Sequence, residues 1–192
     1  MIIIFLRLVR KINSLYERLT LKSKIFYYSQ LYKGRFSIHS SLKAGKGFSI
    51  KSDLSETTLV VSNGITFRDG VKILLGHSGK ISMGANCFFN NNCSINCLGN
   101  IGIGNDNQFG ENVLLYDHNH QYGDVSQLIS KQGYNIGKIV IGNNCWIGSN
   151  VVILKDVEIG DNVVIGAGCV IYKSISRNTV VVNQQNLVEK PT

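Results

Sequence analysis

The sequence predicts a mainly β fold, in which short parallel strands stack as a solenoid, with a helix at the N-terminus and one protruding loop. From Ile141 onward an aliphatic residue returns at every sixth position, and a second, mostly small residue returns four positions after it. Such a repeat indicates a solenoid because single turns cannot close a core, whereas stacked turns bury a continuous one. One long break in the repeat predicts the loop.

The N-terminal segment, residues 1–34, has the pattern of a basic amphipathic helix. From residue 2 to about residue 30, apolar side chains recur at steps of three or four, at Phe5, Leu8, Ile12, Leu15 and Leu19. Residues 1–46 hold ten of the twenty Lys and Arg residues and one acidic residue, Glu17. We expect the helix to pack on the main domain or on a neighbouring subunit, with a contact to a membrane surface as the alternative.

The second segment, residues 35–192, contains the repeat as two interleaved registers. The first register is Ile141, Ile147, Ile153, Ile159, Ile165 and Ile171, and the second is Cys145, Val151, Val157, Val163, Cys169 and Ile175. With three hexads in each coil, residues 18 apart should stack, such as Ile141 over Ile159. Glycine follows the aliphatic residue at four positions, where we expect sharp corners that need its conformational freedom and its lack of a side chain: Gly142, Gly148, Gly160 and Gly166.

Upstream the repeat is less regular. Two shorter runs are Met83, Phe89, Ile95 and Ile103, Phe109, Leu115. A two-residue slip between these runs predicts a small bulge near Leu98 and Gly99. The five cysteines form no CxxC pair, and four of them fall in the small register, which predicts free thiols that act as small core residues: Cys87, Cys93, Cys145 and Cys169.

Composition limits the class of protein. A chain of 192 residues suits one domain, and its apolar start from Met1 to Leu6 is far shorter than the ~20 residues of a membrane span. We therefore expect neither export nor a membrane span. The basic residues lack the interleaved aromatic residues that stack on bases, so we expect no nucleic acid as a partner.

The break in the repeat spans residues 116–138 and has the sequence YDHNHQYGDVSQLISKQGYNIGK. A loop of this length in a compact fold is usually functional or disordered. It contains two of the four histidines, His118 and His120. We expect the chemistry of the protein here.

The run IGNNCWIGSNVVILKDVEIGDNVVIGAGCVIYKSI, together with the upstream DHNH loop, resembles the C-terminal coils of hexapeptide-repeat acetyltransferases, particularly those acting on sugars and polysaccharide building blocks. The resemblance extends from about Met83 to Val188. It implies a left-handed parallel β-helix, a cytoplasmic homotrimer with active sites between subunits, and transfer of an acetyl group from acetyl-CoA without a metal. The implied acceptor is a sugar hydroxyl in surface polysaccharide biosynthesis.

The resemblance also implies site residues. It places the general base at His120, with His118 as the alternative, and an imidazole with a pKa near ~6.5 suits deprotonation of a hydroxyl. Asp117 or Asp124 would orient the ring. Contacts with the acceptor are implied for Asn90 and Trp146. The later coils would hold acetyl-CoA on small residues and on one lysine, namely Gly148, Ser149, Gly166, Ala167, Gly168 and Lys173.

Three alternatives stay open. The same fold could transfer the acetyl group to nitrogen, on an amino sugar or an antibiotic. A zinc enzyme of the carbonic anhydrase type would need a third histidine such as His77 beside His118 and His120, but the expected HxxxxH spacing is absent. A non-catalytic β-helix scaffold would leave the long loop without a purpose.

Overall fold

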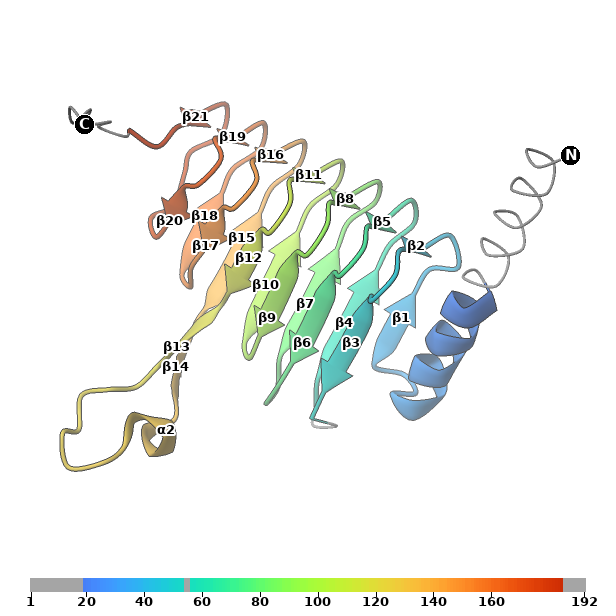
Figure 1. The fold of residues 1–192 in the computed structure, drawn as a ribbon, viewed down its shortest axis with the longest axis horizontal. Helices are drawn as coiled ribbons and strands as arrows, with labels where there is room; N and C mark the ends of the chain where they lie inside the picture. The colour runs from blue at the N-terminus through green and yellow to red at the C-terminus, as the bar shows by residue number, and fades with distance from the viewer. Residues whose placement is uncertain (1–18, 54–55, 185–192) are drawn as a thin grey trace, which may run out of the picture.

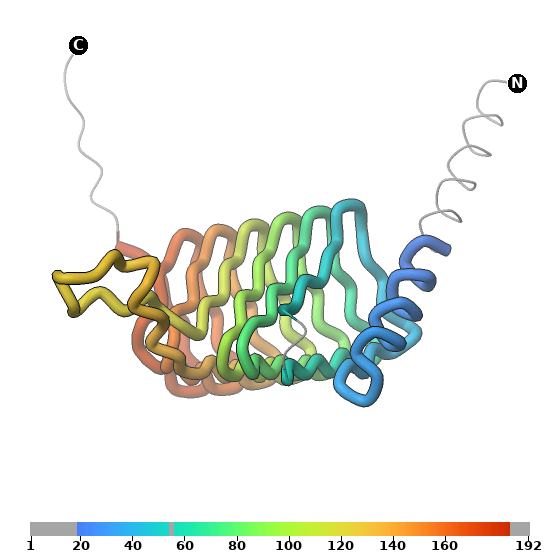
Figure 2. The backbone as a smooth tube through the Cα atoms, turned by 90° about the horizontal axis from the view of Figure 1, so that it is seen from below, coloured from blue at the N-terminus to red at the C-terminus, as the bar shows by residue number. Residues whose placement is uncertain are grey.

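The computed structural model describes residues 19–53 and 56–184, so the predicted helical residues 2–18 lie outside it. Its main body is a parallel β-solenoid whose strands stack into three sheets, and the predicted fold class is confirmed (Figure 1). Figure 2 shows the coils stacked along one axis, with a helix at the N-terminal end and a loop near the other end. We name the three sheets the first, second and third faces.

Each face is a ladder of short strands in regular order. The first face contains β1 Phe36–Ile38, β4 Thr58–Val61, β7 Lys80–Met83, β10 Asn100–Ile103, β15 Lys138–Ile141 and β18 Val157–Ile159. The second face contains β2 Lys43–Ala44, β5 Thr66–Phe67, β8 Phe88–Phe89, β11 Gln108–Phe109, β16 Trp146–Ile147, β19 Val164–Ile165 and β21 Val180–Val181. The third face contains β3 Ser49–Ser52, β6 Lys72–Leu75, β9 Ser94–Cys97, β12 Leu114–Tyr116, β17 Val152–Ile153 and β20 Val170–Ile171.

The predicted stacking of residues 18 apart is confirmed in the C-terminal coils. The parallel pairs are Ile141 with Ile159, Ile147 with Ile165, and Ile153 with Ile171. Both predicted registers point into the core, where they are buried from Ile141 to Ile171. The predicted bulge is a corner at Leu98 and Gly99, between β9 and β10.

The N-terminal coils fill the same column with aromatic rings instead of isoleucine. Phe67, Phe89 and Phe109 follow one another along the second face, and the last two rings are stacked with centroids 4.2 Å apart. The ring of Phe48, at the corner before β3, stacks on Phe67. Burial of these large side chains supplies much of the hydrophobic stabilisation of this half. Each coil therefore depends on its neighbours for its core.

The corners correct one part of the glycine prediction. Gly142, Gly148 and Gly160 do not adopt a positive φ; asparagine and aspartate take the left-handed conformation there, as Asn144 and Asn162 do with φ of 54° and 57°. Asn and Asp tolerate this region better than other non-glycine residues. The glycines are instead needed for close approach between coils, because a Cβ at Gly148 would lie 2.6 Å from the backbone nitrogen of Ala167.

One buried polar residue interrupts the small register. Asn107 is fully buried, and its side chain donates to the carbonyl of Gly142 and accepts from the backbone N–H of Cys145, at 2.8 and 2.7 Å. A valine here would leave both backbone groups without partners, which costs ~1–3 kcal/mol for each group. Asn107 therefore joins the coil before the long loop to the coil after it.

All five cysteines are buried free thiols, as predicted, and burial raises the pKa of the Cys93 thiol to about 11. Burial likewise raises the pKa of Cys87 and Cys145. Because the thiolate is the reactive form, a pKa raised by two units lowers the reactive fraction of Cys93 about a hundredfold near neutral pH. We expect slow reaction of native protein with dithionitrobenzoate at pH 8, and rapid release of five equivalents after unfolding. A rapid equivalent from the native protein would contradict the burial.

Residues 19–31 form the described part of the N-terminal helix. Leu21, Ile25 and Tyr28 pack against the core, and Tyr32 just after the helix is buried. The expected packing on the main domain is thus observed for this part. Within residues 19–53 and 56–184, no helix is long and apolar enough to cross a membrane.

Candidate functional site

The long loop leaves the solenoid between β12 and β15, at the corner that joins the third face to the first (Figure 1). It starts and ends as an antiparallel hairpin of β13 His118–His120 and β14 Tyr134–Ile136, with the short helix α2 Ile129–Gln132 near its tip. His118 is paired with Ile136, and His120 with Tyr134. Because side chains alternate along a strand, both histidines lie on the same side of the hairpin.

Asp117 fixes the point at which the hairpin begins. Its carboxylate is fully buried and accepts hydrogen bonds from the backbone N–H groups of Leu98 and Gly99, at 2.9 and 2.8 Å. It also accepts a hydrogen bond from Nδ1 of His118 at 3.0 Å. An ionised carboxylate only accepts hydrogen bonds, so this contact places the Nδ1 proton on His118 and leaves Nε2 as its second nitrogen.

The ring of Tyr134 packs between the two loop histidines. Its centroid lies 5.3 Å from that of His118, with perpendicular planes, and 4.6 Å from that of His120. The His118 side chain is 17% exposed, whereas His120 belongs to the exposed residues. In the part of the chain that the structure describes, no side-chain hydrogen bond involves His120, and its ring lies open to a substrate.

His118 also borders a hollow of about 290 Å³ on the third face. Its other lining residues come from β3, β6 and β9 of the third face and from the corners that follow them, among them Lys51, Asp53, Leu74 and Asn96. The hollow has both apolar and polar walls beside an imidazole. This combination is typical of small-molecule sites.

Asp124, the second carboxylate expected to orient a histidine, bonds elsewhere. It accepts from the backbone N–H and the hydroxyl of Ser126, and from the side-chain amide of Gln127. These hydrogen bonds lower the pKa of Asp124, the contact with the Ser126 hydroxyl most strongly. Asp124 therefore shapes the outer part of the loop.

A second polar cluster occupies the corner between the second and third faces. The side-chain amide of Asn90 donates to Glu111 at 2.5 Å, and the hydroxyl of Ser149 donates to the same carboxylate at 2.7 Å. The hydrogen bond from Ser149 is the largest cause of the lowered pKa of Glu111. Trp146 precedes this corner on the second face, and its side chain is 60% exposed instead of packed in the core.

The small residues expected to bind acetyl-CoA continue this corner towards the C-terminus. Gly148 stacks against Ala167, and Gly166 stacks against Val182. Because the expected residues here have small side chains or none, the surface of this corner projects little along two successive coils. Lys173 follows β20 and therefore lies at the other corner, where the third face meets the first, with its ammonium group 5.7 Å from the centre of the exposed Tyr172 ring.

The structure thus places the expected site residues at two different corners. Asp117, His118 and His120 lie where the third face meets the first, whereas Asn90, Ser149 and Trp146 lie at or beside the corner of the second and third faces. A body of stacked strands separates the two groups within one chain.

Two contributors are absent from the sequence-based expectations. Tyr134 lies beyond the irregular part of the loop, where the six-residue repeat is interrupted. The sequence therefore contains no periodicity that would predict its pairing with His120. Glu111 occupies a variable position of its hexad, although its place one coil above Asn91 follows from the strand register. Among the described residues, no three His, Cys, Asp or Glu side chains gather where a metal ion could bind.

Comparison with known proteins matches residues 138–173 to the family described as "Bacterial transferase hexapeptide (six repeats)". Over 134 residues the chain is 31% identical to WbbJ of Escherichia coli K12, whose name assigns it to O-acetyl transfer in lipopolysaccharide biosynthesis. The matched region is 63% of this chain and 66% of that protein. The chain belongs to the hexapeptide-repeat acetyltransferase family. This membership agrees with the resemblance found in the sequence.

Other members of the hexapeptide-repeat family match a smaller part of their own length. Galactoside O-acetyltransferase of Escherichia coli K12 is 38% identical over 110 residues, which is 56% of this chain and 52% of that protein. The chain spans about half to two thirds of the length of the curated relatives it matches. Among solved structures, a maltose O-acetyltransferase from Clostridium difficile 630 is 26% identical, with a TM-score of 0.55 over 88% of this chain and 82% of that chain.

Proposed function

We propose that this protein is an acetyl-CoA-dependent O-acetyltransferase that acts on a sugar hydroxyl of a surface polysaccharide, such as O-antigen or capsule, or of its precursor. The observation that carries the proposal is the hairpin at the break in the solenoid, which presents two imidazoles on one side. The named activities of the hexapeptide-repeat relatives support the reaction type. A cytoplasmic location belongs to the proposal, since acetyl-CoA is the donor.

In the proposed reaction, His120 is the general base. Its imidazole takes the proton of the sugar hydroxyl while the hydroxyl oxygen attacks the thioester carbonyl. Collapse of the tetrahedral intermediate breaks the carbon–sulfur bond, and the CoA sulfur receives the proton from the imidazolium. Direct transfer needs alignment of the two substrates and a donor for the developing oxyanion, without an acyl-enzyme.

We assign His118 and Asp117 to positioning instead of proton transfer. The carboxylate holds one nitrogen of His118 and two backbone N–H groups of the preceding coil, which orients the first residue of β13. His120, two residues further, has an open ring over Tyr134. The buried carboxylate of Asp117 therefore holds the first residue of β13 in place. A fixed start of this strand orients His120 towards the substrate.

The proposed assembly is a homotrimer with three equivalent sites. The two separate corners support it, because His120 of one subunit needs the Asn90 and Trp146 of a neighbour to complete a site. We propose that Asn90 and Trp146 contact the acceptor, and that Gly148, Ser149, Gly166, Ala167 and Lys173 form the acetyl-CoA site.

Acetyl-CoA binding tests the donor half of the proposal. At a hundred times its Kd, acetyl-CoA should stabilise the folded protein by ~2.7 kcal/mol, which raises the melting temperature. Lys173→Ala should reduce this increase at a fixed acetyl-CoA concentration, because it removes a charge that pairs with a CoA phosphate.

The matched control is Lys72→Ala, which removes an exposed lysine from the third face far from the C-terminal coils. It should keep the full stabilisation. Absence of any stabilisation of the wild-type protein by acetyl-CoA would count against an acetyltransferase and favour the scaffold. Release of CoA with sugar acceptors, and with amino sugars as a second set, then separates O-acetyl from N-acetyl transfer.

A further inference from the structure

The outer side of the N-terminal helix is unusually apolar for an exposed surface. Leu19, Phe26, Tyr27 and Leu31 are 55%, 66%, 59% and 42% exposed, while the opposite side of the helix packs on the solenoid. These four residues lie within residues 19–31 and form one side of the helix, which we name the outer stripe. Apolar side chains gathered on an exposed face indicate an interaction site, whereas scattered ones do not.

The stretch of sequence that contains the outer stripe carries charged residues of one sign only. Lys22 and Lys24 lie within the helix, Lys33 and Arg35 follow it, and no acidic residue occurs from residue 18 to residue 46. Lysine stems can lie along apolar surface while their ammonium groups reach a polar layer. A face that combines exposed aromatic residues with several basic side chains matches an anionic lipid surface, where both kinds of side chain are satisfied.

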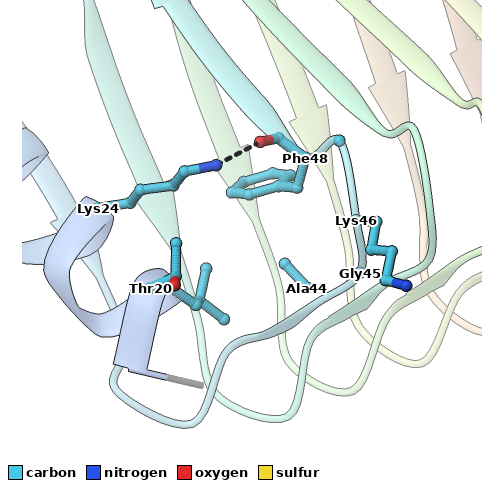
Figure 3. Close-up of a pocket in the computed structure, with 8 residues that line it drawn as sticks. Thr20, Lys24, Ala44, Gly45, Lys46 and Phe48 are labelled. Carbon is cyan, nitrogen blue, oxygen red and sulfur yellow. Dashed lines mark hydrogen bonds between the residues drawn. The ribbon is translucent and has the colours of Figure 1, made fainter. Parts of the chain in front are cut away.

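Further positive charge lies where the helix meets the first coil. Figure 3 shows Lys24 and Lys46 on the two sides of a hollow of about 200 Å³, which is also lined by Thr20 and Phe48. Lys24 reaches across to the carbonyl of Phe48 at 3.4 Å, a long contact that an anionic headgroup could replace. The hollow therefore adds two lysines beside the outer stripe.

We propose that the outer stripe and its flanking lysines dock this protein on an anionic membrane surface, with the solenoid projecting into the water. We propose a lipid bilayer as the occupant and not another protein. The reason is that the basic residues beside the outer stripe are complementary in charge to anionic lipid headgroups. The inference goes beyond the acetyltransferase proposal and stands or falls without it.

Sedimentation of the full chain with vesicles tests the docking. We expect binding to vesicles of phosphatidylcholine mixed with phosphatidylglycerol and little binding to phosphatidylcholine alone, with a marked decrease at high salt. Phe26→Ser should weaken binding about tenfold, since it removes a large apolar side chain from the interface. Lys22→Gln should weaken binding about fivefold, as expected for one lysine near a charged surface.

The matched control is Val125→Ser in the loop, which removes a fully exposed apolar side chain far from the helix. It should bind vesicles like the wild-type protein. Equal binding of the wild type to both kinds of vesicle, or unchanged binding of Phe26→Ser, would overturn the proposal. A change of oligomer size in Phe26→Ser without a change in vesicle binding would instead identify a second copy as the occupant and also overturn it.

Discussion

His120→Asn should lower kcat for acetyl transfer by ~10²–10⁴-fold and leave the Kd for acetyl-CoA unchanged, because the variant removes the proposed base without altering the donor corner. Asparagine keeps polarity and approximate size but cannot take a proton near neutral pH. Steady-state kinetics with a sugar acceptor measure kcat, and thermal shifts with acetyl-CoA measure binding. His39→Asn is the matched control, since His39 lies on the first coil with Ser41 as its partner.

His118→Asn separates the two histidines. If His120 is the base, this variant should retain more activity than His120→Asn, because it loses orientation and keeps the proton acceptor. If His118→Asn loses all activity while His120→Asn stays active, the assignment of the base is wrong and His118 takes the role. Equal activity of both variants and the wild type would contradict a histidine base altogether.

Mixed trimers test whether the site lies between subunits. His120→Asn and Asn90→Ala should each be inactive alone. When equal amounts are unfolded together and refolded, they should recover about a quarter of the wild-type activity. The reason is that a random quarter of the sites receives an intact His120 from one subunit and an intact Asn90 from its neighbour. A site contained within one chain would recover nothing. Recovery would also show that both variants fold.

Asp117→Ala should lower the free energy of unfolding by ~2–6 kcal/mol and also abolish most of the activity. The substitution leaves two buried backbone N–H groups, those of Leu98 and Gly99, without an acceptor, and each such group costs ~1–3 kcal/mol. His118 loses its partner as well. Chemical denaturation followed by circular dichroism measures the change.

Asp124→Ala is the control for the loss of a carboxylate in the same loop. Its hydrogen bonds are exposed and local to the outer loop, so its removal should change the free energy of unfolding by less than about 1 kcal/mol. An equal loss in both variants would mean that the loop as a whole, and not the buried anchor, stabilises the coil. Asp117→Asn should retain part of the stability because one side-chain oxygen still accepts.

The repeat in the sequence was sufficient to predict the stacking of Ile141 over Ile159, because six-residue periodicity and three faces leave one register in which both aliphatic columns are buried. It was not sufficient for the first coils, which are longer than the C-terminal ones, as the pair Leu59 and Ile81 shows. There the number of residues from one strand to the next strand of the same face is not constant from coil to coil. The chain length of a coil varies freely at corners, and only the inward residues are constrained.

The candidate site was less predictable for the same reason. The long interruption located the histidines, but the carboxylate that bonds His118 depends on the geometry of the corner at Leu98, which adjacency in sequence does not give. The assignment of glycine to positive φ was wrong for Gly148 because asparagine one position after Ser149 takes that conformation. Close contact between coils is a property of the stack and is absent from any single hexad.

A stack of parallel strands exposes unpaired backbone groups at each end, and another chain can add to such an edge and start a fibre. At the N-terminal end, the hydroxyls of Tyr28 and Tyr32 bond to the backbone of Ile50 and Ser52 in β3, the terminal strand of the third face. The helix thus occupies acceptors that a second solenoid would need. By covering part of this edge, it hinders the addition of another chain to the end of the stack.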